Sequence, residues 1–294
     1  MKIMIFGSNG LLGSNLYRYF SLIPKYRVIP IDKSIDIRDF NAVLGIINKE
    51  NPDFCINAVA MSDPDSCELD PKKALDINYI GAMNITNAGL KFNAQSIHFS
   101  SDYVYSGVVK EYWESDLPDP LQFYGKTKMA MENSLQAKSV ILRIPFLYGI
   151  NWAKNSGFVN TVYHKIINKI PLYISDQRRR YFTWVWDVCK YVEQLINSFE
   201  VGVYNLSNND NYSKYEVVEK ILKAMKLTSD DIFMVIEGHT YIDLANRPTD
   251  LYKLNTDLLF KKFGNLFSNI DIVLNAEINA FIDLDEKDVF DQAY

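Results

Sequence analysis

Three glycines near the N-terminus constrain the fold of this 294-residue chain more than any other feature. Gly7, Gly10 and Gly13 directly follow the apolar run Ile3–Phe6 and open a helical pattern at Leu11–Phe20. In such a setting the first glycine permits a tight turn, and the second lets a pyrophosphate approach the backbone. The third lets the helix pack closely on the strand. The motif predicts the start of a dinucleotide-binding fold; a glycine-rich turn that binds nothing is the alternative.

Short apolar runs alternate with helical patterns through the first half of the chain. This alternation is typical of a parallel sheet built from strand–helix–strand units. The predicted strands are Ile3–Phe6, Val28–Ile31, Phe54–Ala58, Ser96–Ser100 and Val140–Arg143, and the predicted helices are Leu11–Phe20, Asp39–Lys49, Ile80–Phe92 and Tyr124–Ala137. We therefore expect an α/β fold with a Rossmann-like, doubly wound parallel sheet.

The character of the sequence changes over residues 149–157, where Asn, Trp, Lys and Gly replace the apolar runs. We place a domain boundary there, so that residues 1–150 form a dinucleotide-binding domain. Residues 151–294 are predicted to form mainly a smaller α/β substrate-binding domain, from which some segments return to the first domain. Its predicted elements are the helices Phe158–Asn168, Val185–Asn197 and Ser213–Met225 and the strands Leu172–Ile174 and Val203–Leu206.

Composition is informative mainly for the classes of protein that it excludes. With 48% hydrophobic and 23% charged residues, the chain has the balance of a soluble globular protein. Its formal net charge of −5 argues against a nucleic-acid partner. The sequence contains no apolar span of about 18 residues, so we expect no membrane crossing. Cys55, Cys67 and Cys189 are too few for a disulfide framework or a zinc site, so we expect no metal. The chain opens without a signal-peptide pattern, which favours a cytoplasmic location.

Several residues at predicted strand ends suit contact with a cofactor. Asp32 follows the second strand, where a carboxylate accepts hydrogen bonds from an adenosine ribose. This position favours NAD over NADP, although the lysine that follows can offset repulsion of a 2′-phosphate. Asp36 and Ile37 are placed to line the adenine, but Asp36 would serve equally as a helix cap. Ala58 and Ala60 leave room for a cofactor at the third strand, or simply pack closely.

Tyr124 and Lys128 lie one helical turn apart, so their side chains share a face of the predicted helix. An ammonium beside a phenol lowers the phenol's pKa from about 10 and makes it a proton donor usable near neutral pH. Alone, the spacing is weak evidence. Ser100 and Ser101 end the fourth strand, where a serine can hydrogen-bond a substrate carbonyl and the tyrosine hydroxyl. With a nicotinamide alongside, these groups suit hydride transfer at a carbon that bears oxygen.

The sequence offers no arrangement for hydrolysis or metal binding. His98 lies in a predicted strand, where we expect it to be packed, while His164 lies on a predicted helix and His239 in a predicted loop. An acidic run is formed by Asp65, Glu68 and Asp70, but no His or Cys partners these three carboxylates at metal-ligand spacing. We expect this run to cap a helix that begins at Pro71.

The glycine turn, the strand-end serines and the Tyr-x-x-x-Lys pair, in this order, resemble the extended short-chain dehydrogenases/reductases over nearly the whole chain. Finer motifs are similar to the dTDP-4-dehydrorhamnose reductase family, which also includes the regulatory β subunit of methionine adenosyltransferase. These motifs are Asp65-x-x-Glu68-x-x-Pro71 with Asn78, Ser100–Tyr105, Pro120–Lys128, Leu142–Pro145 and Asn246–Pro248.

The resemblance implies roles for individual residues. The implied catalytic triad is Ser101, Tyr124 and Lys128. The implied cofactor contacts are Gly7, Asn9, Gly10, Leu11, Leu12, Asp32, Ala58, Ala60, Tyr124 and Lys128. The sugar would lie against Ser101, Asp102, Tyr103 and Phe146. Phe146 stands where the rhamnose-forming enzymes tend to carry a tryptophan, so a different deoxysugar stays open. The segment 178–180, three arginines, either holds a nucleotide diphosphate or is a solvated charge cluster.

The activity implied by the resemblance is NAD(P)H-dependent reduction of the C4 ketone of a nucleotide-linked 4-keto-6-deoxysugar, in deoxysugar biosynthesis for surface polysaccharide. The implied cofactor is NADP or NAD, the implied partner is the nucleotide sugar, and a homodimer is compatible with the family. Two alternatives stay open. One is a non-catalytic, NADP-binding regulatory subunit of another enzyme, and the other is an epimerase or reductase acting on another nucleotide sugar.

Overall fold

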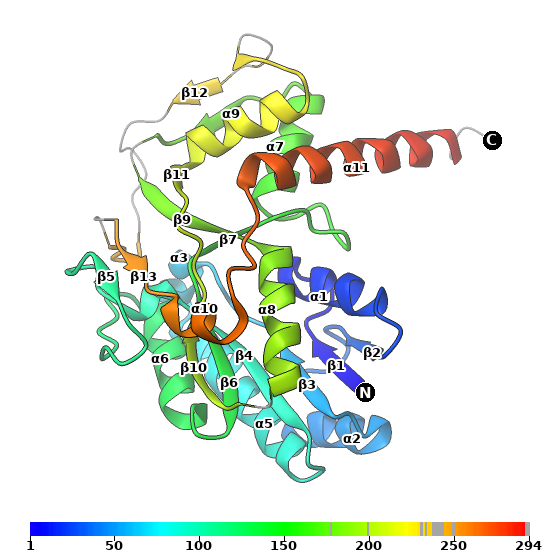
Figure 1. Cartoon of the computed structure of the whole chain (residues 1–294), viewed down its shortest axis with the longest axis vertical. Helices are drawn as coiled ribbons and strands as arrows, with labels where there is room; N and C mark the ends of the chain where they lie inside the picture. The colour runs from blue at the N-terminus through cyan, green and yellow to red at the C-terminus, as the bar shows by residue number, and fades with distance from the viewer. Residues whose placement is uncertain are drawn as a thin grey trace.

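A six-stranded parallel sheet forms the centre of the larger half of the molecule (Figure 1). In the computed structural model of the protein, the described residues are 1–176, 178–198, 200–229, 232, 234–236, 244–248 and 251–291. The strand order is β10-β6-β4-β3-β1-β2. The strands are β1 Lys2–Phe6, β2 Arg27–Ile31, β3 Phe54–Asn57, β4 Gln95–Ser101, β6 Ser139–Ile144 and β10 Gly202–Asn205. The neighbours are all parallel, so the carboxyl ends of the strands meet at one edge.

Helices cover both faces of this sheet, as parallel strands require when neither face can be left to water (Figure 1). On one face α1 (Leu11–Ser21) and α8 (Val185–Ser198) bury the apolar side chains of the central strands. On the other face lie α2 (Phe40–Glu50), α5 (Ala82–Leu90) and α6 (Phe123–Leu135). The predicted Rossmann-like α/β fold is confirmed.

The helix predicted at Ile80–Phe92 is preceded by a π-helix that the apolar pattern does not predict. Residues Asp76–Gly81 form a π-helix, η1, that continues α4 (Pro71–Leu75) and leads into α5. Asn78 lies in η1 and is buried, and its amide donates to the carbonyl of Met61 and to the hydroxyl of Thr127, each at 3.0 Å. These polar contacts hold the wider turn in place, and hydrophobic periodicity alone does not register them.

Carboxylates determine where two of the helices begin. Asp70 caps α4, because its side chain accepts a hydrogen bond from the backbone of Lys73 at 3.0 Å. The predicted capping of a helix at Pro71 is therefore confirmed. Asp39, whose side chain accepts from the backbone of Asn41 at 2.9 Å, caps α2. The interpretation of Asp36 as that cap was wrong, since it lies three residues too early.

The C-terminal half forms smaller sheets with its own apolar core. Its elements, with the short segments that join the two halves, are α3 Pro64–Leu69, η2 Asp102–Val104, β5 Glu111–Tyr112, β7 Phe146–Tyr148, α7 Phe158–Ile167, β8 Leu172–Ile174, β9 Arg179–Trp184, β11 Asn211–Ser213, α9 Lys214–Ala224, β12 Met234–Ile236, β13 Lys253–Leu254, α10 Asp257–Phe263 and α11 Ile270–Asp291. The strand predicted at Val203–Leu206 appears as β10 and pairs with β6 in the large sheet, so the chain returns there after α8. The boundary at residue 150 stays a prediction.

Two of the three histidines, His98 and His164, lie in the described part of the chain. His98 is a packed strand residue, as predicted: its Nε2 lies 2.7 Å from the hydroxyl of Thr86, and burial lowers its pKa to about 3. His164 lies on α7, and His239 lies outside the described residues. No group of three or more His, Cys, Asp or Glu within the described ranges could hold a metal ion.

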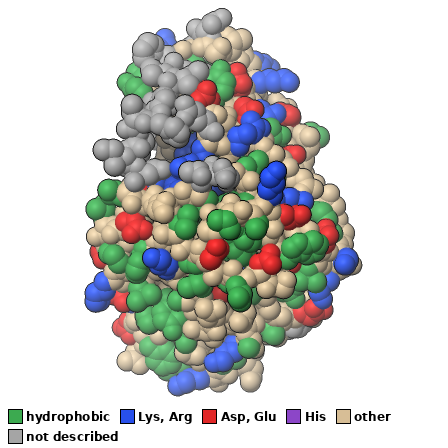
Figure 2. Space-filling model, turned by 90° about the vertical axis from the view of Figure 1, so that its left-hand side faces the viewer, with side chains coloured by type: hydrophobic (Ala, Val, Ile, Leu, Met, Phe, Trp, Pro, Cys, Tyr) green, Lys and Arg blue, Asp and Glu red, His purple; other side chains and the backbone are tan. Residues whose placement is uncertain are grey.

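Acidic and basic side chains alternate over the surface drawn in Figure 2, with hydrophobic side chains between them. This face therefore carries no continuous field of one sign. Among the described helices, none combines the length and the apolar character needed to cross a lipid bilayer.

Candidate active site

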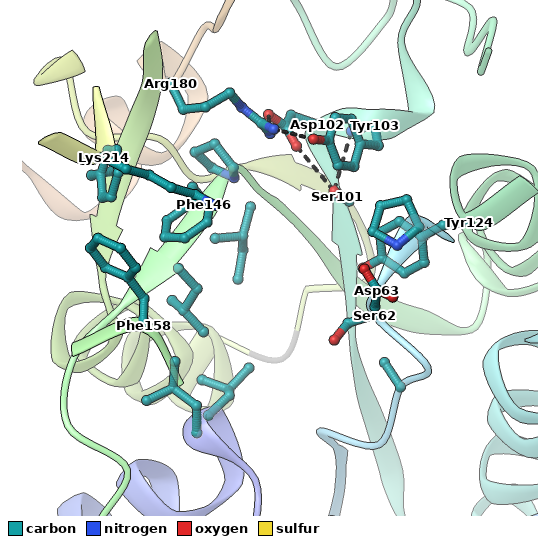
Figure 3. A pocket seen from close by; sticks show the side chains of 18 of the residues that line it. Ser62, Asp63, Ser101, Asp102, Tyr103, Tyr124, Phe146, Phe158, Arg180 and Lys214 are labelled. Atoms are coloured by element: carbon teal, nitrogen blue, oxygen red, sulfur yellow. Dashed lines mark hydrogen bonds and ion pairs between the residues drawn. The ribbon is translucent and has the colours of Figure 1, made fainter. Parts of the chain in front are cut away.

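A pocket of about 1180 Å³ lies between the carboxyl edge of the parallel sheet and the C-terminal half (Figure 3). Its volume exceeds the roughly 300–1,000 Å³ of an ordinary small-molecule site, which leaves room for two ligands. The sheet side contributes Gly10, Leu11, Leu12, Ala58, Ala60, Ser100, Ser101, Asp102, Tyr103, Tyr124 and Lys128. The other side contributes Phe146, Phe158, Lys165, Tyr173, Arg178, Arg180, Phe182 and Lys214.

The glycine turn forms one end of this pocket. Gly7 adopts a φ of +80°, which favours glycine, and the backbone then enters α1 at Gly10. A Cβ on Gly13 would lie 2.1 Å from the carbonyl oxygen of Gly7, so only glycine fits there. Gly10, Leu11 and Leu12 line the pocket where the free amides of the helix N-terminus lie. This cradle fits the pyrophosphate of a dinucleotide.

Other expected cofactor contacts divide into two groups. Ala58 and Ala60 follow β3 and line the pocket, which agrees with their expected position beside a cofactor. The described residues that line the pocket do not include Asn9, Asp32, Asp36 or Ile37. Asp32 is exposed directly after β2, where a backbone amide two residues later donates to its carboxylate at 2.9 Å. Their contact with a cofactor stays a prediction.

Asp36 and Ile37 are both engaged within the protein. The carboxylate of Asp36 accepts the guanidinium of Arg38 at 2.6 Å, and this contact lowers the pKa of Asp36 to about 2. The side chain of Ile37 is buried, and a Cβ on Gly81 would lie 2.4 Å from its Cδ1. Arg38 therefore holds the side chain of Asp36, and η1 holds the side chain of Ile37. Their expected contact with an adenine stays a prediction.

The first turn of α6 places the tyrosine and the lysine. The side chain of Gln122 caps this helix by accepting the backbone amide of Gly125 at 2.9 Å. A Cβ on Gly125 would lie 2.0 Å from the carbonyl oxygen of Tyr103, so this glycine lets α6 lie directly against η2. Tyr124 and Lys128 consequently face the end of β4. No local residue pattern identifies Gly125 as necessary, because the requirement arises from a contact between distant segments.

Tyr124 and Lys128 are buried, with 8% and 4% of their surfaces exposed. The ammonium of Lys128 donates to the carbonyl of Phe99 at 2.9 Å and lies 5.7 Å from the centre of the Tyr124 ring. Burial lowers the pKa of Lys128 to about 8. Burial, with the nearby charge of Asp102, raises the pKa of Tyr124. The expected lowering of this phenol's pKa was wrong, because desolvation outweighs the attraction of the ammonium.

The two strand-end serines differ in their hydrogen bonds. Ser101 donates to the carboxylate of Asp102 at 3.0 Å and accepts the backbone amide of Tyr103 at 3.2 Å. Ser100 is also buried and lines the pocket, but its hydroxyl has no hydrogen-bond partner among the described residues. An unpartnered buried hydroxyl at a pocket wall is available to a ligand.

The opposite wall is aromatic and cationic (Figure 3). Phe146 contacts Phe158 and Phe182 with ring centres 5.8 and 4.7 Å away, and the ammonium of Lys214 lies 5.8 Å over its ring. Phe146 was expected at the sugar, and the structure places it on the pocket wall. Sequence reasoning missed five other residues of this wall, because they come from α7, β8, β9 and α9 and share no local pattern: Phe158, Lys165, Tyr173, Phe182 and Lys214.

The three arginines of segment 178–180 separate in space. Arg179 turns outward and pairs with Glu216 at 2.8 Å. Arg178 and Arg180 line the pocket, and Arg180 forms an ion pair with the buried carboxylate of Asp102. The interpretation as a solvated charge cluster was therefore wrong for Arg180.

A second ion pair closes the rim of the pocket. The guanidinium of Arg247 contacts both carboxylate oxygens of Asp65, at 3.0 and 2.9 Å. The backbone amide of Ala245 donates to the same carboxylate at 2.9 Å. These contacts hold segment 244–248 against α3.

Replacing Lys128 by methionine is expected to stabilise the folded chain. The pKa of Lys128 falls from 10.5 to about 8 on folding, so burial of the charge costs roughly 3 kcal/mol. This cost is complete below pH 8, declines between pH 8 and 10.5, and is absent above. After subtracting about 1 kcal/mol for the bond to Phe99, Lys128→Met should gain roughly 1–2 kcal/mol at pH 7 and little at pH 10.5.

Urea unfolding of the wild type and Lys128→Met at the two pH values measures this gain. Lys126→Met is the matched control, because Lys126 is exposed on the same helix and its loss should change stability by less than about 0.5 kcal/mol. A Lys128→Met protein less stable than the wild type at pH 7 would contradict the expected cost.

The comparisons with known proteins agree on one family. Residues 1–268 match the family described as RmlD substrate binding domain. Methionine adenosyltransferase 2 subunit beta from Bos taurus is 30% identical over 249 residues, which cover 79% of this chain and 74% of that protein. A dTDP-4-dehydrorhamnose reductase from Aggregatibacter actinomycetemcomitans is 28% identical over 269 residues, covering 85% and 89%. The crystal structure of dTDP-4-dehydrorhamnose reductase from Bacillus anthracis in complex with NADP superposes with a TM-score of 0.84 at 25% identity, covering 96% and 99%.

Proposed function

The chain belongs to the RmlD substrate binding domain family, and from this premise we propose that it is an NAD(P)H-dependent reductase of a nucleotide-linked 4-keto-6-deoxysugar. One observation carries the proposal: Ser101, Tyr124 and Lys128 lie at the same pocket whose end is the glycine turn. The reductase relatives support the substrate class, and the bacterial reductase bound to NADP supports the cofactor.

The residues present fit a nicotinamide dinucleotide. The turn at Gly7 and Gly10, with the N-terminus of α1, would hold its pyrophosphate, and Ala58 and Ala60 leave space beside β3. Lys128 would hold the ribose next to Tyr124. When bound in its reduced form, the cofactor supplies a hydride for the ketone carbon.

The proton for the ketone oxygen comes from Tyr124. Its raised pKa keeps the phenol protonated at neutral pH, so it enters the reaction as an acid. The ammonium of Lys128 stabilises the phenolate that remains after the proton has left. The unpartnered hydroxyl of Ser100, at the end of β4, donates a hydrogen bond to the oxygen that becomes the hydroxyl, and Ser101 lies beside it at the same strand end. Carbon C4 thus gains a hydride and its oxygen gains a proton, which yields an alcohol.

A turnover assay tests this function. The purified chain is mixed with NADPH or NADH and a dTDP-linked 4-keto-6-deoxysugar, and loss of the nicotinamide absorbance is followed with detection of the C4 alcohol. We expect consumption that requires both the sugar and the protein. Consumption confined to another nucleotide sugar would indicate the related epimerase or reductase function.

The relative from Bos taurus favours a second candidate, a cofactor-binding regulatory subunit. The same turn and the same Tyr124 and Lys128 would then bind the dinucleotide without turnover. Co-purification of a stoichiometric partner enzyme from the native host, with no consumption of reduced cofactor on any keto sugar, would support this candidate over the reductase.

A further inference from the structure

Arg180 connects the C-terminal half of the molecule to the reactive end of the pocket (Figure 3). It projects from β9, and its Nη2 lies 2.5 Å from the carboxylate of Asp102 in η2. Its other terminal nitrogen donates to the hydroxyl of Tyr103, over whose ring the guanidinium carbon lies at 4.3 Å. The side chain of Asp102 is 5% exposed and that of Arg180 is 18% exposed, so the pair is largely shielded from water.

The second oxygen of Asp102 determines where the proton of Ser101 points. Ser101 donates its hydroxyl hydrogen to this oxygen at 3.0 Å. A serine hydroxyl has one hydrogen, so while that hydrogen points to Asp102 the oxygen of Ser101 accepts the backbone amide of Tyr103 at 3.2 Å. Ser101 also contacts the phenol of Tyr124, and this contact opposes the rise in the pKa of the phenol. The backbone carbonyl of Asp102 also accepts a hydrogen bond from the hydroxyl of Tyr252 at 2.9 Å, which helps to hold η2 in place.

The charge of Asp102 also acts on Tyr124. After burial, the carboxylate of Asp102 is the strongest influence that raises the pKa of this phenol. The other titratable groups that face Tyr124 are Tyr103 from η2, Cys67 from α3 and Lys128 from α6. Arg180 offsets the field of Asp102, because an opposite charge at 2.5 Å leaves little net charge at a distance.

We propose that Arg180 is a positioning residue of this site: it holds Asp102, and through Asp102 it fixes the hydroxyl of Ser101 for proton transfer at Tyr124. This inference rests on the proposed function. It assigns Arg180 a role inside the protein, through Asp102, rather than a direct contact with the reacting carbon. Because Arg180 belongs to β9 and Asp102 to η2, the pair also ties the two halves of the pocket together.

Four variants separate positioning from simple structural support. Arg180→Met leaves a buried carboxylate unpaired, so the alkaline limb of the kcat–pH profile should move up by roughly 1 pH unit. Asp102→Asn removes that charge, so the limb should move down relative to the wild type. The double variant Arg180→Met/Asp102→Asn has no unpaired charge, which protects its folding, and its limb should lie close to that of the wild type because a matched pair of charges is removed. Arg180→Lys should restore the wild-type limb in part.

Arg179→Met is the matched control. Arg179 is the preceding residue of β9 and carries the same charge, but it pairs with Glu216 and Asn211 away from the pocket. Its pH profile should equal that of the wild type. If Arg180→Met and Arg179→Met give the same profile, or if the double variant follows Arg180→Met, the proposed role of Arg180 is overturned.

A binding measurement distinguishes failure of this inference from failure of the proposed function. The affinities for NADP⁺ and NAD⁺ are measured against pH, because a cationic nicotinamide ring favours the ionised phenol of Tyr124. The pH midpoint should shift upward in Arg180→Met and downward in Asp102→Asn. If the two variants show these shifts while the wild-type protein shows no turnover, the reductase function is contradicted and the role of Arg180 is supported. A chain that binds neither dinucleotide would overturn both.

Discussion

Replacing Tyr124 by phenylalanine is expected to lower kcat for the ketone reduction by about 10²- to 10⁴-fold, the usual contribution of a positioned acid. The substitution removes a single hydroxyl from a buried ring, so the fold and the apolar contacts of the ring persist. Lys128 and the glycine turn are untouched, and the affinity for the dinucleotide should therefore change by less than about tenfold. Steady-state kinetics and fluorescence titration with NADPH measure the two effects separately.

Tyr17→Phe is the control for the loss of a phenolic hydroxyl as such. Tyr17 lies on α1 and is 41% exposed, so this variant should keep full turnover. A Tyr124→Phe protein with more than about one tenth of the wild-type kcat would exclude Tyr124 as the proton donor. If Tyr124→Phe loses affinity for the dinucleotide but keeps its kcat, Tyr124 contributes to cofactor binding and not to proton transfer.

Replacing Gly13 by alanine is expected to abolish measurable dinucleotide binding and to destabilise the fold by roughly 3 kcal/mol. The new Cβ would lie 2.1 Å from the carbonyl oxygen and 2.7 Å from the carbonyl carbon of Gly7, both of them backbone atoms that cannot rotate aside. The turn between β1 and α1 must then open, which moves the amides that would face the pyrophosphate. Thermal unfolding and titration with NADPH and NADH measure the two losses.

Gly45→Ala is the matched control for Gly13→Ala, because the same substitution is expected to stabilise the chain there. Gly45 lies within α2, and a Cβ there would have no atom within 4 Å. Alanine should stabilise this helix by about 0.5–1 kcal/mol and leave dinucleotide binding unchanged. Gly13→Ala protein that still binds the dinucleotide with wild-type affinity would show that the close approach of α1 to the turn is not needed for the site.

The site residues that the sequence predicted share one property. Each lies at the end of a strand, in the turn that follows it, or on one helix, so its place follows from local sequence alone. Gly7 and Gly10 follow β1, Ala58 follows β3 and Ser101 ends β4, so a parallel sheet brings them to one edge without further information. The Tyr124–Lys128 spacing likewise defines a face once α6 is known to be a helix.

The parts that the sequence could not predict depend on contacts between distant segments. The pKa of Tyr124 depends on how deeply α6 is buried and on Asp102, neither of which follows from a four-residue spacing. Lys165 and Lys214 reach the pocket from different helices. The ion pair of Arg180 with Asp102 joins residues 78 positions apart, so the run of arginines did not predict it.

The return of β10 to the large sheet has a consequence for how the chain folds during synthesis. When residues 1–150 have left the ribosome, β6 still has an open edge, and the face that α8 covers is still bare. Both are supplied only after residues 185–205 have been made. An unpaired strand edge is a template for aggregation, so the nascent chain is vulnerable over this interval. We therefore expect the two halves to fold as a single unit, with neither half stable as an independent module.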